Sequence, residues 1–309
     1  MIKISILIPN YNGEQLLKKN LSRVFASAEH YTHKAQEEVE IILIDDYSTD
    51  NSLDYLKNKK VKVIKNTKNL GFSSTVNIGV KEAKGEIIIL LNTDVAPEEN
   101  FIEPLIGYFT NKEVFAVGCM DKSIEGEKTI LRGRGIGKWQ RGFLIHKKGE
   151  VDKQTTLWVS GGSGAFRRSI WEKLGGFSEF YNPFYWEDID LSYRALKSGY
   201  KIVFEPKSIV AHEHEKGAIK TKYSAFQIKT IAYRNQIIFA WSNISDYTLL
   251  LSHIFWLPSY LVRAIFTGDL SFILGFVKAI ILLPAIVLSR SRIHKYFTKG
   301  DQEVITELE

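Results

Sequence analysis

Three groups of polar residues have the types and spacing needed to bind a divalent metal or to move a proton. Asn92-Thr93-Asp94 follows a run of isoleucine and leucine, Trp186-Glu187-Asp188-Ile189-Asp190 carries three carboxylates, and His212 follows an apolar stretch. Carboxylate oxygens and a neutral imidazole are good ligands for manganese and similar metals. Acids clustered near one another can have raised pKa values, which suits a general base. Asp94 and His212 are therefore candidate metal ligands, and Asp188 is a candidate general base.

Each of these patterns also has a purely structural interpretation. Taken alone, Asn92-Thr93-Asp94 is better explained as a turn or helix cap before Pro97. Acids at a helix start are stabilised by the helix dipole, and Asp190 can pair with Arg194 one turn later. These two effects account for Glu187 and Asp190 but leave Asp188 unexplained. The His212-x-His214 spacing also occurs in zinc sites, but no cysteine or third histidine lies nearby in the sequence.

Alternating strand-like and helix-like segments must position these groups. Strands are expected at 4–8, 39–44, 61–65, 86–91 and 200–204, and helices at 14–28, 52–58, 73–83, 97–109, 168–174 and 188–198. This alternation predicts an α/β fold with a Rossmann-like, mostly parallel sheet flanked by helices. Ligands of such sheets bind beyond the carboxyl ends of the strands. Pro9–Asn12, Asp45-Asp46 and Asn92–Asp94 follow three of the strands, so we expect them to share one edge of the sheet.

The end of the first strand limits how a nucleotide would be bound. Pro9-Asn-Tyr-Asn-Gly13 stands where a dehydrogenase has G-x-G-x-x-G, and the chain has no P-loop. Something other than a glycine-rich loop must then neutralise the phosphates, and a divalent metal, Mn²⁺ or Mg²⁺, is the natural cofactor. Arg132–Gly137 is glycine-rich and basic. A mobile loop near the site and an ordinary surface loop explain it equally well.

Composition narrows the possible partners and compartment. The 309 residues suffice for one large domain or one domain with an appendage, and the net charge of +6 is scattered along the chain. No zinc-knuckle, helix-turn-helix or RNA-binding signature is present, so no nucleic acid partner is expected. The single cysteine, Cys119, suits a reducing compartment, and the N-terminus has no signal-peptide pattern. We therefore expect a cytoplasmic catalytic part.

The composition changes near the C-terminus, where two long apolar segments occupy 247–266 and 272–288. Each is interrupted by a proline and a cation, and each is marginal against the roughly 20 apolar residues of a spanning helix. We expect two amphipathic or re-entrant helices at the inner face of the cell membrane, with a helical subdomain or dimer interface as the alternative. Basic residues that follow suggest contact with anionic lipid: Arg290, Arg292, His294, Lys295 and Lys299. This divides the chain into a catalytic domain, 1–222, and a helical, membrane-associated region, 223–309.

A larger set of motifs, in its order and spacing over roughly the first 215 residues, resembles family-2 glycosyltransferases of the GT-A fold. The resemblance is closest to the rhamnosyltransferase-like branch that builds bacterial surface polysaccharides. The motifs that carry it are Ile8-Pro-Asn-Tyr-Asn12, Leu43-Ile-Asp-Asp-Tyr-Ser-Thr-Asp50, Asn69-Leu-Gly-Phe72 with Asn77, Leu91-Asn-Thr-Asp94, Ser160-Gly-Gly-Ser-Gly164, Gly175-Gly-Phe177, Trp186-Glu-Asp-Ile-Asp-Leu191, Gly199-Tyr200 and His212.

The resemblance implies an inverting transfer of a sugar from a nucleotide-diphosphate donor, dTDP-rhamnose or a UDP-sugar, to a hydroxyl of a saccharide or lipid-linked saccharide. It implies that Asp46 accepts from the pyrimidine N3–H, that Asp94 and His212 bind the metal on the donor diphosphate, and that Asp188 deprotonates the acceptor. The remaining residues that it places are Pro9, Tyr11, Asn77 and Asn92 beside the nucleotide, and Gly161, Gly162, Trp186 and Glu187 beside the acceptor.

One departure from the family concerns Asn92, which stands where the commonest D-x-D form has its first aspartate. The change removes one negative charge and so bears on metal affinity and metal choice. Two rival functions remain. A nucleotidyltransferase would normally have a basic glycine-rich loop after the first strand, where this chain has Pro9-Asn-Tyr-Asn. A non-catalytic sugar-nucleotide sensor or membrane scaffold would not need Asp188, Asp94 and His212 together.

Overall fold

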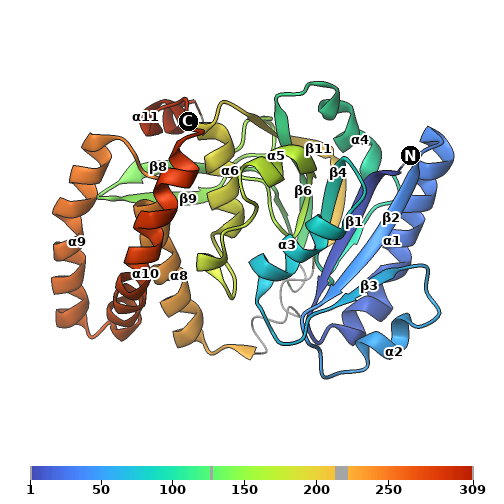
Figure 1. The fold of residues 1–309 in the computed structure, drawn as a ribbon, viewed down its shortest axis with the longest axis horizontal. Coiled ribbons are helices and arrows are strands. Elements are labelled where there is room, and N and C mark those ends of the chain that lie inside the picture. The colour runs from blue at the N-terminus through green and yellow to red at the C-terminus, as the bar shows by residue number, and fades with distance from the viewer. Residues whose placement is uncertain (1, 126–127, 213–221, 308–309) are drawn as a thin grey trace.

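The computed structural model describes residues 2–125, 128–212 and 222–307 (Figure 1). Its elements in chain order are β1 (Ile2–Asn10), α1 (Glu14–Ala35), β2 (Glu38–Asp45), α2 (Ser52–Leu56), β3 (Lys62–Lys65), α3 (Phe72–Glu82), β4 (Ile87–Leu91), β5 (Val95–Pro97), α4 (Ile102–Ile106), η1 (Gly107–Thr110), β6 (Val114–Glu125), β7 (Lys128–Arg132), β8 (Gly135–Gln140), β9 (Phe143–Lys148), β10 (Ser163–Arg167), α5 (Arg168–Lys173), η2 (Glu179–Tyr181), α6 (Glu187–Lys197), β11 (Lys201–His212), α8 (Ala225–Asn243), α9 (Tyr247–Thr267), α10 (Leu270–His294) and α11 (Asp301–Thr306).

The main sheet has the strand order β3-β2-β1-β4-β10-β6-β11-β5, and β7 pairs with β6. β1, β2, β3 and β4 pair in parallel, as do β6 and β11, which confirms the predicted α/β alternation. β10 runs antiparallel to both β4 and β6, and β5 runs antiparallel to β11, so the sheet is mixed beyond β4. Because antiparallel partners need no helical crossover, an alternating pattern does not reveal them.

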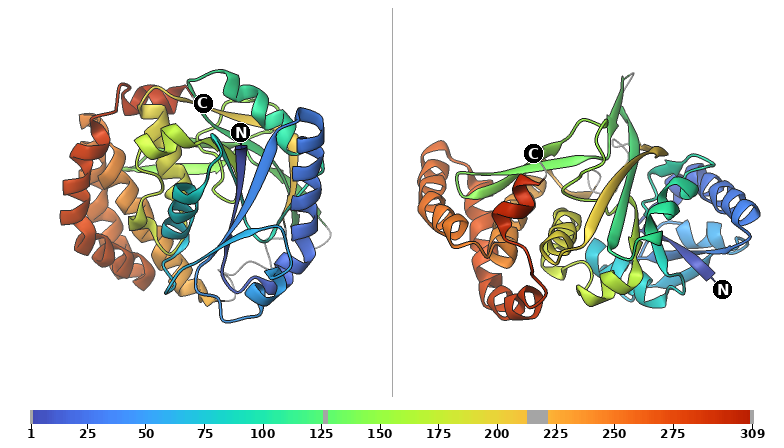
Figure 2. Two further views of the ribbon diagram at one scale, coloured as in Figure 1. Left: turned by 45° about the vertical axis from the view of Figure 1, so that its right-hand side comes forward. Right: turned by 90° about the horizontal axis from the view of Figure 1, so that it is seen from above.

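Apolar residues cover both faces of the sheet. One core cluster packs α1 and α4 against it, and a second packs α3, α5 and α6 against the opposite face. The view from above in Figure 2 shows the sheet passing between these two helical layers. Every residue of β4 is buried, which explains its continuous run of isoleucine and leucine. The carboxyl ends of β1, β2 and β4 therefore open at one edge of a rigid core.

The predicted helix at 97–109 is wrong in its first half. Val95–Pro97 forms β5, in which Pro97 pairs with Val210 at the sheet edge, and the helix α4 begins only at Ile102. Proline lacks an N–H group and is tolerated in an edge strand, where one side of the backbone needs no partner.

The loop predicted for Arg132–Gly137 is also wrong. Arg132 ends β7, and Gly135 begins β8, which pairs with β9 in a separate two-stranded sheet. A Cβ atom on Gly135 would lie 2.0 Å from the ring of Trp158, and one on Gly137 would lie 2.4 Å from Leu157. Glycine occurs here because β8 packs closely against its neighbours, and only Gly133 and Arg134 lie outside the strands, as a short link between β7 and β8.

The C-terminal helices share a third apolar core with the catalytic part, formed by α6, the β8–β9 hairpin and α8 to α11. A buried ion pair joins α6 to α11, with 2.9 Å between Lys197 Nζ and Asp301 Oδ1. The predicted boundary at residue 222 adjoins 213–221, which lie outside the described residues. The boundary therefore separates two parts of the chain that pack against one core.

α9 and α10 lie at the outer edge of the molecule (Figure 1). Among the described residues, both are long and apolar enough to cross a membrane by length and composition, and only 17% and 28% of their most apolar windows are buried. Large apolar side chains on their outer faces are exposed, including Phe255, Phe266, Ile281 and Leu288. The helices therefore present a continuous apolar surface, which we call the α9–α10 face.

The predicted basic cluster needs correction, because three of its five members bind the protein itself. Arg290 donates to the carbonyls of Trp241 and Ile244, and the His294 imidazole lies 2.8 Å from the Ser242 carbonyl. Lys299 pairs with Glu307. These side chains satisfy carbonyls at the C-terminal end of α8 or bind a carboxylate, so only Arg292 and Lys295 remain exposed for lipid.

Candidate active site

The three polar clusters that follow β1, β2 and β4 meet at one edge of the sheet, as predicted. The Asn10 side chain donates to Asp45 over 2.8 Å, and the Asp46 backbone N–H donates to the Asn10 carbonyl. Asn20 on α1 donates to the Thr93 carbonyl over 2.8 Å. Buried hydrogen bonds thus fix the three strand ends relative to one another.

The buried carboxylate of Asp46 organises the segment 66–71. It accepts from the Asn66 side chain (2.9 Å) and from the backbone N–H groups of Leu70 (2.7 Å) and Gly71 (2.9 Å). A carboxylate has about four acceptor positions, so one remains for the predicted contact with a nucleotide base. That contact stays a prediction, but the bonds show how Asp46 is held at the strand end.

Pro9 lies near the end of β1 and Tyr11 directly follows the strand, and both are half-buried. The ring of Tyr11 has the Lys222 ammonium 4.1 Å from its centroid, a cation–π distance. Lys222 also lies 3.4 Å from Asn69 Oδ1. Lys222 therefore lies against the end of β1 and the 66–71 segment.

Asn77, predicted beside the nucleotide, is fully engaged by the protein. Its amide nitrogen donates to the Phe177 carbonyl (2.8 Å) and its oxygen accepts from the Phe177 N–H (3.0 Å). A Cβ atom on Gly176 would lie 2.4 Å from the Asn77 oxygen, which explains the glycine there. These contacts indicate that Asn77 positions the 175–177 turn, and its predicted nucleotide contact stays a prediction.

Asp94 and His212, the two predicted metal ligands, are neighbours. His212 Nε2 lies 3.3 Å from Asp94 Oδ2, and His212 Nδ1 lies 3.0 Å from Asp121 Oδ2. Burial alone would lower the pKa of His212, but the hydrogen bonds to Asp121 and Asp94 outweigh it and raise the pKa to about 9. Asp121 was missed at the sequence level, since it lies inside β6 with no motif around it.

The amide of Asn92 completes this side of the site. Its backbone N–H donates to the Gly162 carbonyl over 2.9 Å, while its side-chain oxygen is buried without a hydrogen-bond partner. A Cβ atom on Gly162 would lie 2.6 Å from the Asn92 amide nitrogen, so glycine is needed for the side chain of Asn92 to fit. The predicted role of Gly162 in acceptor approach is a separate, untested prediction.

The donor set fits a divalent cation. No group of three or more His, Cys, Asp or Glu among the described residues forms a ready-made metal site. Asp94 and His212 nevertheless offer one carboxylate and one imidazole side by side, and the unpartnered Asn92 oxygen lies two residues before Asp94. Mn²⁺ accepts this mixture of oxygen and nitrogen ligands and takes further oxygens from phosphate.

Asp188 lies at the start of α6, facing the segment that contains Gly161. Its Oδ2 accepts from the Gly161 N–H over 3.2 Å, and its Oδ1 accepts from the Ile189 N–H over 2.8 Å. Burial raises the pKa of Asp188 above the usual aspartate range, although these hydrogen bonds oppose the rise. Gly161 and Gly162 are adjacent, so Asp188 and Asn92 hold consecutive residues of one segment.

Glu187 differs from its neighbour. Burial, followed by the charge of Asp188, raises the pKa of Glu187 well above the usual range, and its Oε2 has no hydrogen-bond partner. Both pKa values of this pair are raised, and that of Glu187 is raised further, so Glu187 keeps its proton to a higher pH than Asp188 does. Of the two carboxyl groups, Asp188 is therefore the one that ionises more readily.

Trp186 is buried, and its ring contacts His146 and Phe239 at centroid distances of 4.9 and 5.2 Å. Both Tyr185 and Trp186 have left-handed backbone conformations, with φ of 71° and 77°. Such conformations in non-glycine residues cost energy and concentrate at functional sites. The turn places the Asp188 carboxylate against the Gly161 N–H. Tyr185 is exposed, whereas Trp186, predicted beside the acceptor, is buried, and its acceptor contact stays a prediction.

Known proteins resemble this chain in sequence and in fold. A family model described as glycosyl transferase family 2 matches residues 5–175. The O-antigen chain rhamnosyltransferase RfbN of Salmonella typhimurium is 26% identical over 220 residues, which cover 69% of this chain and 67% of that protein. The structure of GalNAc-T7 with UDP, GalNAc and Mn²⁺ aligns with a TM-score of 0.62 at 20% identity, covering 80% of this chain and 49% of that one. The structure of S. aureus TarS 1-349 with UDP-GlcNAc aligns with a TM-score of 0.59 at 15% identity, covering 99% and 91%.

Proposed function

The chain belongs to glycosyl transferase family 2 and has the GT-A fold, and from that premise we propose that it is an inverting enzyme that moves a sugar from a nucleotide diphosphate to an acceptor hydroxyl. One observation carries the proposal. The adjacent residues Gly161 and Gly162 bind Asp188 on one side and Asn92 on the other. The base Asp188 and the strand end that would bind the donor diphosphate are thereby held against the same segment. Displacement of the diphosphate by an acceptor hydroxyl requires the base and the leaving group to be held close together in this way.

On the donor side, Asp46, Tyr11 and Pro9 hold the nucleotide at the ends of β1 and β2. Asp94 and His212 hold Mn²⁺ or Mg²⁺, which when bound offsets negative charge on the leaving diphosphate. The relative solved with UDP and Mn²⁺ supports the choice of cofactor. Asp121 orients the His212 ring through Nδ1, which directs Nε2 toward Asp94.

On the acceptor side, Asp188 removes the proton of the attacking hydroxyl. Its two oxygens are oriented by the N–H groups of Gly161 and Ile189, and its raised pKa increases its basicity. Because the pKa of Glu187 is raised further than that of Asp188, Asp188 ionises first and serves as the base of the pair. A base on the attacking side, with no carboxylate assigned to a covalent intermediate, gives inversion at the anomeric carbon.

The donor is dTDP-rhamnose or a UDP-sugar: the name of RfbN, a rhamnosyltransferase, supports rhamnose as the sugar, and the ligands of the two solved relatives support UDP as the nucleotide. The acceptor is a saccharide or a lipid-linked saccharide. The α9–α10 face supports attachment to the inner face of the cell membrane, because burying such a large apolar surface in the interface is favourable.

A donor screen tests this function. Purified protein with Mn²⁺ or Mg²⁺ is scored for release of UDP or dTDP from a panel of sugar nucleotides, with and without lipid-linked acceptors, beside Asp188→Asn and Asp94→Ala. Release from one donor, lost in both variants, supports the transferase. Nucleotide binding without release from any donor favours a sugar-nucleotide sensor.

A further inference from the structure

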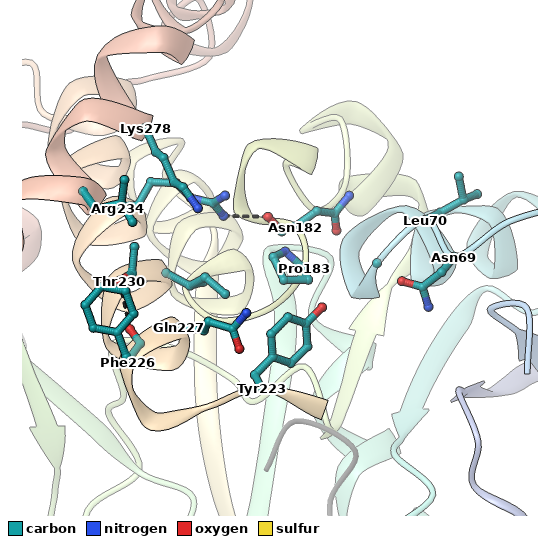
Figure 3. Close-up of a pocket in the computed structure, with 13 residues that line it drawn as sticks. Asn69, Leu70, Asn182, Pro183, Tyr223, Phe226, Gln227, Thr230, Arg234 and Lys278 are labelled. Atoms are coloured by element: carbon teal, nitrogen blue, oxygen red, sulfur yellow. Dashed lines mark hydrogen bonds between the residues drawn. The ribbon is translucent and has the colours of Figure 1, made fainter. Parts of the chain in front are cut away.

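A cavity of about 450 Å³ lies outside the residues assigned above. Its walls come from the 69–71 segment, the Asn182-Pro183 turn, α8 and α10. Figure 3 shows Asn69 and Leu70 on one side of the cavity and Arg234 and Lys278 on the other. The cavity therefore joins the sheet-edge site to the helices that carry the α9–α10 face.

The lining of this cavity is positively charged. Arg234 and Lys278 line it, and its described lining residues include no Asp or Glu. Among the described residues, Arg234 donates to neutral acceptors, which include the Asn182 carbonyl (2.6 Å) and the Asn235 side chain (2.8 Å). Burial lowers the pKa of Arg234 to about 10, a sign that its charge lacks full compensation. A half-buried guanidinium without a carboxylate favours an anionic ligand.

One wall of the cavity is apolar and continues onto the outer surface. Leu274 lies one helical turn before Lys278 and is 38% exposed. Ile281 lies three residues after Lys278 and is 71% exposed. Residues at these spacings share one face of a helix. The cationic cavity thus opens onto the same strip of α10 that forms part of the α9–α10 face.

The cavity is also connected to the segment that carries the base. Arg234 donates to the Asn182 carbonyl, and Asn235 donates to the carbonyls of Phe184 (2.9 Å) and Tyr185 (2.8 Å). Asp188 follows three residues later. A group bound at Arg234 therefore lies beside the turn that aims the base.

We propose that this cavity binds the phosphate of a membrane lipid that carries the acceptor saccharide, an inference that rests on the proposed transferase function. Arg234 and Lys278 bind the phosphate, Leu274 and the α9–α10 face contact the lipid chain, and the saccharide extends toward Asp188. The two cations favour this ligand over a free sugar, which has no charge, and the adjoining apolar wall favours it over free phosphate, which has no lipid chain.

Binding measurements on the purified protein in detergent, with all 309 residues present, test the proposal. The probes are farnesyl phosphate, farnesol and inorganic phosphate, and vesicles containing phosphatidylglycerol report general attraction to anionic lipid. Lys278→Gln leaves the fold intact because its side chain is exposed, and Arg234→Gln removes the second cation. Arg292→Gln is the matched control, an exposed cation on the same helix that does not line the cavity.

We expect farnesyl phosphate to bind at least tenfold more tightly than farnesol or inorganic phosphate. We expect Lys278→Gln and Arg234→Gln each to weaken it about tenfold, as for loss of one charge-assisted contact, and Arg292→Gln to leave it unchanged. Equal affinity for farnesyl phosphate and farnesol, or equal loss in Lys278→Gln and Arg292→Gln, would overturn the proposal. A stronger effect of Lys278→Gln on phosphatidylglycerol vesicles than on farnesyl phosphate also overturns it, since the cavity then binds bulk lipid headgroups.

Nucleotide binding in the same samples separates this proposal from the proposed function. Variants that bind UDP or dTDP normally but lose farnesyl phosphate support the cavity as a distinct acceptor site. A wild-type protein that binds no nucleotide, yet shows the selective, Lys278-dependent binding of farnesyl phosphate, refutes the transferase and retains the lipid-phosphate site.

Discussion

His212 Nδ1 lies 3.0 Å from the Oδ2 atom of Asp121, although the two residues are 91 positions apart in the chain. Their strands, β11 and β6, are parallel neighbours in the sheet. The contact directs the other ring nitrogen of His212 toward Asp94, 3.3 Å away. A carboxylate behind a metal-binding histidine fixes its tautomer and its orientation, so Asp121 supports the predicted metal site without touching the metal.

Asp121→Asn is expected to weaken Mn²⁺-dependent nucleotide binding by roughly tenfold or more, the usual effect of losing such a supporting carboxylate. Calorimetric titration of UDP or dTDP at several Mn²⁺ concentrations measures it. Asp94→Ala, which removes a proposed ligand, should have a larger effect that also depends on metal. If nucleotide binding by Asp121→Asn depends on the Mn²⁺ concentration as it does in the wild type, Asp121 does not support the metal site.

Asp188→Asn is expected to lower the transfer rate by about 10²–10⁴-fold, the usual contribution of a general base, while leaving nucleotide affinity unchanged. Glu187→Gln is its matched control. Because burial raises the pKa of Glu187 well above its usual range, a neutral amide at this position should cost less than about tenfold. Steady-state kinetics with the donor found in the screen measures both variants, and the reverse order of effects would make Glu187 the base.

The raised pKa of Asp188 also predicts the pH profile of transfer. A base acts in its ionised form, so kcat/KM should fall as the pH decreases through this raised pKa. The acid limb is therefore expected above the ordinary aspartate range. Glu187→Gln should retain this limb, and a limb that disappears in Glu187→Gln contradicts the assignment.

Gly162→Ala is expected to reduce nucleotide binding and transfer without unfolding the protein. The added Cβ atom would lie 2.6 Å from the Asn92 amide nitrogen and displace it from the metal side of the site. Gly107→Ala provides the control, because no atom lies within 4 Å of a Cβ atom built there. Similar transfer rates for the two variants would mean that the position of Asn92 does not matter.

Four substitutions on the α9–α10 face are expected to release the protein from lipid vesicles. Phe255, Phe266, Ile281 and Leu288 are 74%, 86%, 71% and 73% exposed. Burying each in a membrane contributes about 1.5–3 kcal/mol, so changing all four to Gln should lower vesicle binding by well over 100-fold. Flotation with phosphatidylglycerol vesicles measures this loss. Leu131→Gln, at an exposed apolar position on β7, should float like the wild type.

Asp301→Ala is expected to destabilise the whole chain by about 3–5 kcal/mol, because it leaves the buried Lys197 charge unpaired. Urea denaturation measures the change in the free energy of unfolding. Replacing both partners, by Lys197→Met with Asp301→Leu, should restore much of the loss. Independent unfolding of the two regions, with no effect of Asp301→Ala on residues 1–222, would show that the ion pair does not couple them.

The same pair has a defined pH dependence. Burial alone would raise the pKa of Asp301, but the hydrogen bond and charge of Lys197 outweigh it and lower the pKa. The stabilisation is therefore fully present above the ordinary aspartate range and is lost as the pH falls through the lowered value. Near neutral pH the unfolding free energy should not change through this group.

The sequence alone determined the family, the α/β alternation and the edge of the sheet where the site lies. These features are local: isoleucine-rich runs such as Ile87–Leu91 predict strands, and the polar residues directly after them must lie at the strand ends. Asn92, Asp94 and Asp46 were found in this way. Short motifs in a fixed order then identified the fold without any knowledge of long-range pairing.

The tertiary structure decided which of these residues meet and what each side chain binds. Only the pairing of β6 with β11 brings Asp121 to His212, and only the fold brings Gly161 to Asp188. Cations such as Arg290 and Lys299, which suggested lipid contact in the sequence, bind carbonyls and carboxylates of the protein instead. Hydrogen bonds and charge compensation depend on neighbours in space, whereas a sequence pattern reports only neighbours along the chain.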